Sequence, residues 1–541
     1  MSGDFSHLRA LVIDDSHMAR MTLSGVLRDV GIGRIKGVTN PHHARVHLQS
    51  HAYDVILCEY HFSSDETGQD LLDEIRYQRL IPFRTVFFMV TGEASYEKVA
   101  EVVENAPDDY LLKPFKPAAL EERLHKALAK KLALLPIYEK MEAADYDGAL
   151  ERCETLVRNG DAQWLHAARI GAELCLYLKR HARASEFYDL VLKAKALPWA
   201  KLGLAQLAYA TSDATRARGA LEALVSDTAA YADAYDLLAR IYVEEGALGE
   251  ALATLRSAVQ ATPANPMRLQ KLGSFAFFIG EPDEAEAALA KAFRLGAGSR
   301  AFDWQGVALL AMLRLDRGDT AKELDRLCIA LAGAVEKDPD AWRLRATHEF
   351  ACACASMARR NPTDVVARLK TMEKWIDQPQ FDFETACGLL SLLSRVASQE
   401  IRLPEAPHWI ERIARRHCAS KTAADLLLAA LRGVREYVEI ADREHARVNQ
   451  LANEAMSRLV KGDADGAAHR LTELARKTLN ARLFGLAESL ALRHRERLSD
   501  ASMSLILQAQ EMRHKYCAQG THVALARLAE GPRGGRVLPV A

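Results

Sequence analysis

Five polar side chains in the N-terminal quarter of the chain each stand at the end of a short apolar run. Asp14 and Asp15 follow one run, Glu59 ends a second, Thr91 follows a third and Lys113 a fourth. Three carboxylates placed close together repel one another, and a hard divalent cation such as Mg²⁺ relieves that repulsion. A lysine and a threonine opposite them can hold an anionic oxygen. These residue types suit a phosphoryl group carried on the central carboxylate, Glu59.

These residues can meet only if the apolar runs form one sheet. Five β-type runs alternate with helical patterns; the runs are Leu8–Ile13, Arg34–Thr39, Val55–Cys58, Thr85–Val90 and Tyr110–Leu112. The helical patterns are Met18–Val30, Pro41–Ser50, Gly68–Gln78, Tyr96–Asn105 and a segment that begins at Pro117. This alternation predicts an α/β doubly wound parallel sheet covered on both faces. The working site of such a sheet lies beyond the carboxyl ends of its strands, where the polar residues fall.

Three motifs carry a resemblance to a known family: Val12-Ile13-Asp14-Asp15-Ser16, Met89-Val90-Thr91 and Asp109-Tyr110-Leu111-Leu112-Lys113-Pro114-Phe115. In this order and spacing they resemble a CheY-like response-regulator receiver domain, of the five-stranded flavodoxin-like fold. The resemblance implies a Mg²⁺ site made by Asp14, Asp15, Glu59 and the backbone carbonyl of His61. It also implies that Thr91 and Lys113 read the phosphoryl group. Tyr110 matches the aromatic switch residue on the α4–β5–α5 face of the family.

One position departs from the family pattern. The aspartate that accepts phosphate falls on Glu59, and neither Asp54, before the strand, nor Asp65, in the loop after it, takes its place. Three interpretations stay open. Glu59 mimics the phosphorylated state; or it is a relic in a domain kept as a docking surface; or it still accepts phosphate or binds metal in a regulated way. A glutamate carries less negative charge than a phosphate group, so any mimicry is partial.

An Ala/Leu-rich helical pattern replaces the β pattern from Pro117 onward. The helix that begins there is expected to run through Leu124, Leu128 and Leu132 with few breakers before Pro136. We therefore expect the last helix of the first domain to lead almost directly into the next domain. A helical connection would couple the two mechanically, unlike a flexible tether.

Leucines and small residues recur with a period of 34 residues: Leu204, Leu238 and Leu272; Ala205, Ala239 and Gly273; Ala217, Ala251 and Ala285; Leu221, Leu255 and Leu289. Small residues let two helices approach closely, and leucines fill the space between them. One helix pair cannot bury its own apolar face, so the pairs must stack into an all-α superhelical solenoid. The pattern resembles the tetratricopeptide repeat (TPR), with its best copy from Tyr235 to Pro263. The resemblance implies a groove that binds proteins.

The patterns predict four segments. Residues 1–128 form the receiver domain and 129–300 form the TPR repeats. The repeat signature weakens after that, so 301–500 are expected to be divergent TPR-like helical repeats. Residues 501–541 are expected to hold a terminal helix and a disordered tail, because the chain ends in a stretch rich in Gly, Pro and Arg.

Composition and motifs limit the classes of protein to which the chain can belong. The formal net charge of −1 argues against nucleic acid as a partner. No apolar stretch approaches the roughly 20 residues that a membrane span needs, and no signal peptide is visible. Nine scattered cysteines suit a reducing cytoplasm. Cys352 and Cys354, the one close pair, are not expected to bind metal because residues two apart on a helix point to different faces. We find no phosphate-loop, nucleotide-binding or nucleophile motif, so no enzyme is expected.

These observations predict a cytoplasmic, non-enzymatic adaptor of two-component signal transduction. In it a pseudo-receiver carrying Glu59 controls a TPR surface that binds proteins. The expected partners are proteins that meet the groove or the receiver face, with a histidine kinase among the candidates. Two alternatives stay open: a conventional response regulator with slow phosphotransfer and autodephosphorylation, and a TPR regulator that senses a peptide.

Overall fold

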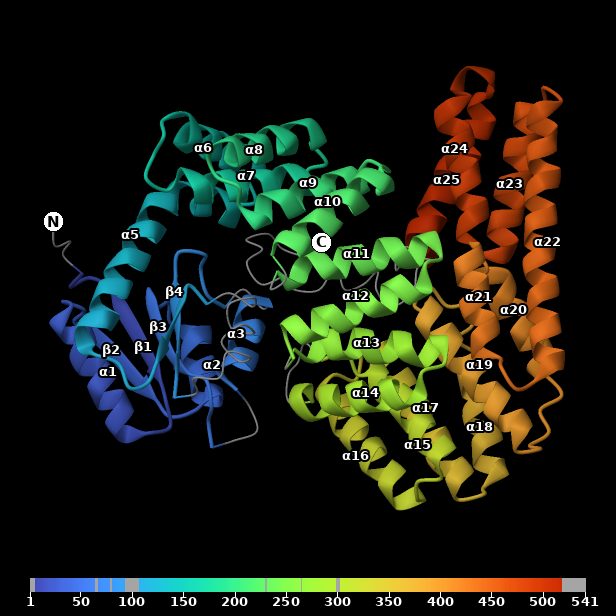
Figure 1. The fold of residues 1–541 in the computed structure, drawn as a ribbon, viewed down its shortest axis with the longest axis horizontal. Helices are drawn as coiled ribbons and strands as arrows, with labels where there is room; N and C mark the ends of the chain where they lie inside the picture. Colours follow the sequence, from blue (N-terminus) through green and yellow to red (C-terminus); the bar gives the residue numbers. More distant parts are fainter. Residues whose placement is uncertain are drawn as a thin grey trace.

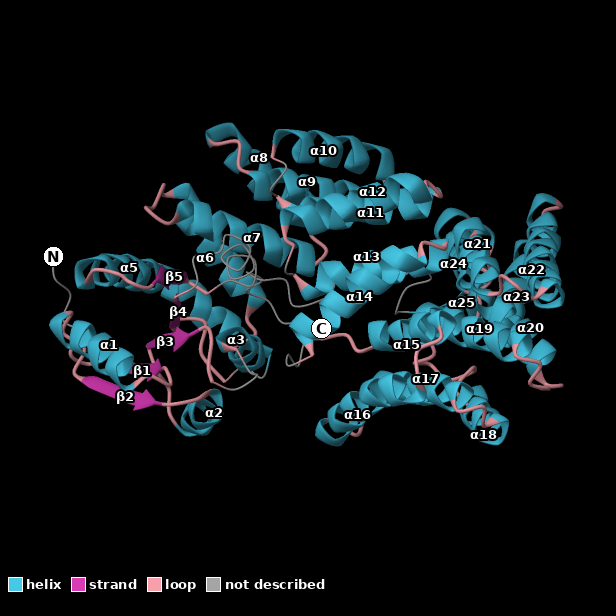
Figure 2. Cartoon of the chain, turned by 60° about the horizontal axis from the view of Figure 1, so that its bottom comes forward, coloured by secondary structure: helices cyan, strands magenta, loops and turns pink. Residues whose placement is uncertain are grey.

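The computed structural model describes residues 5–63, 67–77, 80–92, 107–228, 231–263, 265–297 and 302–517. Its N-terminal part is a five-stranded parallel sheet in the order β2-β1-β3-β4-β5. The strands are β1 (Arg9–Ile13), β2 (Arg34–Val38), β3 (Val55–Glu59), β4 (Val86–Thr91) and β5 (Asp109–Leu112). The predicted five-stranded doubly wound fold is confirmed, and the predicted strands differ by one residue at their ends. The strands lie together at one end of the molecule (Figure 2).

Helices cover both faces of the sheet. The helices α1 (His17–Asp29) and α5 (Pro117–Glu142) cover one face, and α2 (Pro41–Ser50) and α3 (Gly68–Tyr77) cover the other. Because both faces are covered, β3 and β4 are buried along their whole length, which explains their continuous apolar sequences. The predicted helix Tyr96–Asn105 lies outside the described residues.

Helix α5 belongs to two hydrophobic cores. Its first half contributes Leu120, Leu124 and Ala127 to the core of the sheet. Its second half contributes residues from Leu134 to Met141 to the core of the first helical repeats. The helix continues through Pro136 to Glu142, so the sheet and the repeats share one rigid element. Leu132, which lies between the two cores, is 70% exposed.

The remainder of the described chain is helical (Figure 1). The helices are α6 (Tyr146–Arg158), α7 (Trp164–Tyr177), α8 (His181–Ala194), α9 (Pro198–Ala210), α10 (Ala214–Asp227), α11 (Ala232–Glu245), α12 (Leu248–Ala261), α13 (Pro266–Ile279), α14 (Pro282–Gly296), α15 (Gln305–Arg317), α16 (Ala321–Lys337), α17 (Trp342–Ala358), α18 (Pro362–Glu373), α19 (Phe383–Ser398), α20 (Ala406–His417), α21 (Lys421–Ala430), α22 (Arg435–Val460), α23 (Ala464–Thr478), α24 (Ala481–Arg493) and α25 (Asp500–Cys517). The predicted all-helical solenoid after the sheet is confirmed. The predicted disordered tail lies outside the described residues.

Close helix contacts explain the small residues of the 34-residue period. A Cβ atom added to Gly273 of α13 would lie 2.6 Å from Cγ of Leu289 in α14. The pair α13–α14 can therefore pack this closely only around a glycine. Gly246 and Gly280 end α11 and α13 in the left-handed conformation, with φ of 79° and 92°. Glycine adopts this conformation without the steric cost that a side chain adds.

Some contacts between helices beyond residue 300 have a spacing close to that of the repeats. Arg359 contacts Asp325 across 34 residues, and Ser499 contacts Asp465 across 34 residues. Arg482 contacts Asn449 across 33 residues. This spacing supports the proposal that 301–500 are divergent repeats. The later helices also return to the earlier ones: α21 packs against α11 and α13, and Arg432 donates to the carbonyl oxygen of Ile279 at 3.2 Å.

A search for membrane-spanning helices covered the described residues. None of the helices there is both long enough and apolar enough to cross a membrane.

Candidate functional site

The carboxyl ends of the strands bring the predicted site residues into one pocket. The Lys113 ammonium, just after β5, donates to Asp14 Oδ2 at 2.8 Å and to Glu59 Oε2 at 2.5 Å. These partners lie 99 and 54 residues away in the sequence, after β1 and at the end of β3. The lysine therefore bridges the two carboxylates that the parallel sheet places side by side.

Both oxygens of the Glu59 carboxylate are engaged. While Oε2 binds Lys113, Oε1 accepts hydrogen bonds from the backbone amides of Tyr60 at 2.7 Å and His61 at 3.2 Å. The Glu59 side chain is 10% exposed. Its longer arm thus spans the distance from the strand end to the lysine and is fixed at both oxygens.

The two aspartates after β1 have different surroundings. Asp14 is 1% exposed, and its Oδ1 accepts from the backbone amide of Ser16 at 2.8 Å. Asp15 is exposed and turns toward Ser63, whose backbone amide donates at 2.9 Å and whose hydroxyl also donates. The hydroxyl of Ser63 is the main cause that lowers the pKa of Asp15, against the desolvation that would raise it.

Lys113 supplies the positive charge of the pocket. Burial alone would lower the pKa of its ammonium, but the hydrogen bonds and charges of Asp14 and Glu59 outweigh that effect and raise the pKa. Lys113 is therefore charged at neutral pH and compensates part of the negative charge of its two partners.

The side chains as placed do not form a magnesium site. Among the described residues, no group of three or more His, Cys, Asp or Glu side chains is placed to hold a metal ion. The Lys113 ammonium lies between Asp14 and Glu59, and Asp15 faces Ser63. A Mg²⁺ ion at Asp14, Asp15, Glu59 and the His61 carbonyl therefore stays a prediction from the family resemblance.

The other predicted site residues lie around this pocket. Thr91 is buried at the end of β4, and its carbonyl oxygen accepts from the Lys113 amide at 2.6 Å. His61 forms an isolated bridge with Thr67. Tyr110 is half-buried in β5 against the core on the α2–α3 face. The helix of the predicted switch face that precedes β5 lies outside the described residues.

Arg123 of α5 links the backbone at Tyr110, in β5, to α5. Its guanidinium donates to the Tyr110 carbonyl oxygen at 3.0 Å and to Asp109 Oδ1 at 2.9 Å.

Asp54 lies at the opposite end of β3 from Glu59, where it accepts from the Arg9 amide at 2.9 Å. Asp54 therefore has a structural role, and Asp65 lies outside the described residues.

A clamp between the sheet domain and α5 was not predicted from the sequence. Lys131 donates to the carbonyl oxygen of Phe83 at 2.8 Å, and Glu142 accepts from the Phe83 amide at 2.8 Å. The rings of Phe83 and Tyr138 lie 6.1 Å apart. Phe83 precedes β4, so this loop is held against the half of α5 that packs on the repeats. No local pattern marks these residues, because their partners are distant in sequence.

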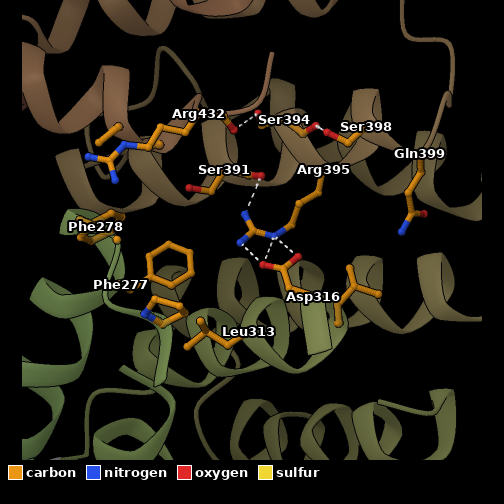
Figure 3. A pocket seen from close by; sticks show the side chains of 15 residues that line it. Phe277, Phe278, Leu313, Asp316, Ser391, Ser394, Arg395, Ser398, Gln399 and Arg432 are labelled. Carbon is orange, nitrogen blue, oxygen red and sulfur yellow. Dashed lines mark hydrogen bonds and ion pairs between the residues drawn. The ribbon is translucent and has the colours of Figure 1, made fainter. Parts of the chain in front are cut away.

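A cavity of about 520 Å³ lies where α13 and α15 meet α19 and α21. Arg395 points across it to Asp316 and stacks over the Phe277 ring at 5.5 Å (Figure 3). Arg432 donates to the Ile279 carbonyl at its edge. Because these charged groups have partners within the chain, the cavity gives no distinct ligand chemistry.

Comparisons with known proteins identify both parts of the chain. Residues 10–125 match the response regulator receiver domain, and residues 232–265 match the tetratricopeptide repeat. The chain is 28% identical over 120 residues to chemotaxis protein CheY-3 of Vibrio cholerae, covering 22% of this chain and 91% of that protein. It is 27% identical over 119 residues to chemotaxis protein CheY of Pseudomonas aeruginosa, covering 22% and 94%.

Solved structures resemble the same two parts. The chemotaxis response regulator CheY4 of Vibrio cholerae is 28% identical, with 22% of this chain and 98% of that chain covered and a TM-score of 0.21. A tetratricopeptide repeat protein from Parabacteroides merdae is 13% identical, with 53% and 98% covered and a TM-score of 0.32.

The matches to the two family models confirm the predicted combination of a receiver domain with tetratricopeptide repeats. A receiver domain implies two-component signalling, and the repeats imply protein interaction.

Proposed function

We propose that this protein is an adaptor of two-component signalling whose pseudo-receiver holds one fixed state and controls a TPR surface that binds proteins. The observation that carries the proposal is the bond of Glu59 to Lys113 at 2.5 Å. The resemblance to the receiver family implies that Lys113 binds the phosphoryl group. In this protein the Glu59 carboxylate binds Lys113 in the absence of phosphate.

The position of the Glu59 carboxylate argues against phosphate acceptance. Its longer arm moves the carboxylate away from the place of an aspartate, and Lys113 and the backbone amide of Tyr60 hold it there. The carboxylate also carries less charge than a phosphorylated residue, so the state that it holds is a partial mimic.

Helix α5 offers a direct path from the pocket to the repeats. It begins at Pro117, shortly after Lys113, and contributes to both cores. Lys131 and Glu142 in its second half also hold the Phe83 loop of the receiver. A change in the Lys113 position would therefore reach the first repeats through packed side chains.

The remaining assignments follow from the two domain types. We assign the protein to the cytoplasm and give it no catalytic activity of its own. Its partners are proteins that dock on the TPR groove or on the receiver face, including a histidine kinase or another signalling protein. Nucleic acid is not among the proposed partners.

Phosphate transfer from a small donor tests the acceptor. Wild type and Glu59→Asp are incubated with acetyl phosphate and Mg²⁺, and intact mass is measured. Wild type should stay unmodified, and Glu59→Asp should gain a phosphoryl group because the shorter acid restores the family acceptor. A stable phosphoryl group on wild-type Glu59 would instead establish a conventional response regulator.

Hydrogen exchange tests the coupling to the repeats. Glu59→Ala should speed amide exchange in both halves of α5 and in α6, whereas Asp54→Ala, at the other end of the same strand, should leave α6 unchanged. Equal exchange in α5 and α6 for wild type and Glu59→Ala would show that the pocket does not control the repeats.

A further inference from the structure

Two cysteines and a histidine meet on neighbouring helices far from the receiver pocket. Cys328 lies on α16, and Cys352 and His348 lie one turn apart on α17, which packs against α16. The Cys352 sulfur is 3.4 Å from His348 Nε2, and the Cys328 thiol is a hydrogen-bonding neighbour of the Cys352 sulfur. All three side chains are partly exposed, so a small molecule can reach them.

The charges around this cluster favour a thiolate at Cys352. The Cys328 hydrogen bond, then His348 and its charge, lower the pKa of the Cys352 thiol well below its usual range, against desolvation. Arg368 and Arg359 add positive charge nearby, while Asp325 and Glu349 partner these arginines. The bond to Cys352 raises the pKa of His348 in turn. Both shifts favour a thiolate at Cys352 beside a protonated His348.

Other cysteines of the chain have the opposite environment. Burial raises the pKa of Cys354, two residues further along α17, to about 12. Burial likewise raises the pKa of Cys517, which is partly exposed, to about 11. The lowered pKa of Cys352 is therefore due to its neighbours and not to its exposure alone. Reactive cysteines occupy such electropositive, accessible places.

We propose that Cys328 and Cys352 form a reactive dithiol, in which Cys352 is the nucleophile toward hydroperoxides and Cys328 is the resolving thiol. His348 is a positioning residue that holds Cys352 as the thiolate. This inference is independent of the proposed receiver function. A dithiol that is reversibly oxidised acts as a sensor and not as a structural disulfide.

The chemistry balances with a hydroperoxide as oxidant. The Cys352 thiolate attacks the peroxide, so that an S–O bond forms, the O–O bond breaks and the leaving oxygen takes a proton from the His348 imidazolium. The sulfur gives up an electron pair and becomes a sulfenic acid, and the peroxide is reduced to water or an alcohol. Cys328 then attacks that sulfur; an S–S bond forms, and hydroxide leaves and combines with the Cys328 proton as water.

The disulfide would link α16 to α17 across one helix pair. Such a link restricts how these helices open, because it closes a short loop within the repeat array. Oxidation would therefore stiffen one position of the solenoid.

Alkylation and oxidation of the full chain test the proposal. The reduced protein is pulsed with iodoacetamide at mildly acidic pH, and labelling is mapped by peptide mass. Cys352 should label at least about fivefold faster than Cys517, the internal control of partial exposure with a raised pKa. In a separate, unalkylated sample of the reduced protein, equimolar hydrogen peroxide should give a Cys328–Cys352 disulfide, seen as the loss of two hydrogens in that peptide pair.

Variants separate the roles of the three residues. Cys328→Ser should leave Cys352 as a sulfenic acid that dimedone traps, and Cys352→Ser should leave Cys328 unoxidised. His348→Gln, which keeps the side-chain size, should move the midpoint of the alkylation pH profile upward, whereas Cys517→Ser should not. The proposal fails if Cys352 labels no faster than Cys517, or if peroxide leaves both thiols free in folded wild type.

Discussion

The receiver and the helical repeats bring charged partners together by different rules. In the receiver, Lys113 binds acids 99 and 54 residues away because three strand ends converge on one pocket. In the helical part of the chain, Arg359 meets Asp325 at a spacing of 34 residues because helices close in sequence pack against one another. Changes in the receiver therefore affect a shared site, whereas changes in the repeats affect one interface at a time.

The receiver core and the repeat core meet along a single helix, α5. Leu124 and Leu134 lie on α5 and are both fully buried, yet Leu124 packs in the receiver core and Leu134 in the repeat core. The two halves of α5 thus offer matched positions at which the two regions can be perturbed separately.

The largest effects are expected from truncation of these leucines. Leu124→Ala and Leu134→Ala should each cost about 2–5 kcal/mol of unfolding free energy, since each leaves a cavity in a packed core. Hydrogen exchange should rise in the sheet for Leu124→Ala and in α6 to α8 for Leu134→Ala. Leu132→Ala, at a position 70% exposed, is the control. The same exchange pattern for both buried variants would contradict two separate cores.

Removal of the charge on Glu59 should come next. Glu59→Gln keeps the shape but weakens the bond to Lys113, at a cost of about 1.5–3 kcal/mol, typical of a charged hydrogen bond. Amide exchange should rise in the sheet and, to a smaller extent, along α5 into α6. Asp109→Asn, which breaks the more exposed pair with Arg123, should cost less than about 1 kcal/mol. Equal costs would mean that the pocket pair is no stronger than a surface pair.

Glycine at the small-residue position of a repeat gives a local test. Gly273→Ala should destabilise the protein by about 1–3 kcal/mol, because the added Cβ meets Leu289 in α14. Gly219→Ala in α10 places its Cβ in open space and should stabilise that helix by about 0.5–1 kcal/mol. Amide hydrogen exchange should become faster in α13 and α14 for Gly273→Ala, and it should stay unchanged in the receiver domain.

Acid should weaken the repeats through His417. This side chain is buried beside Phe381 and Phe383, and its Nε2 has no hydrogen-bond partner among the described residues. Burial, with the charge of Arg416 opposed by Asp382, lowers its pKa well below the usual value. The unfolded chain therefore binds the extra proton first, and stability falls as pH drops below about 6.5.

The preference of the unfolded chain for protonated His417 should lower the free energy of unfolding by up to about 1.4 kcal/mol for each pH unit below about 6.5. Thermal unfolding of wild type and His417→Gln at neutral and mildly acidic pH measures it, and the variant should show the smaller acid dependence. An identical dependence in both proteins would assign the effect to other groups.

Much of the fold could be read from local patterns. The predicted strands match the observed ones to within one residue at each end, because buried parallel strands are continuous apolar runs. The period that relates Leu238 to Leu272 predicted the repeats, since stacked helix pairs impose it on the sequence. After residue 300 the small residues and leucines no longer recur at this period, so the sequence signal fades there.

The sequence by itself determined which residues stand at the strand ends, Glu59 among them. Only the tertiary structure decided that Lys113 joins Asp14 to Glu59, that Phe83 is held by Lys131 and Glu142, and that Cys352 meets Cys328 rather than Cys354. The physical reason is that periodicity reports which face of an element is buried. The partner of a side chain depends instead on how elements distant in the sequence pack together.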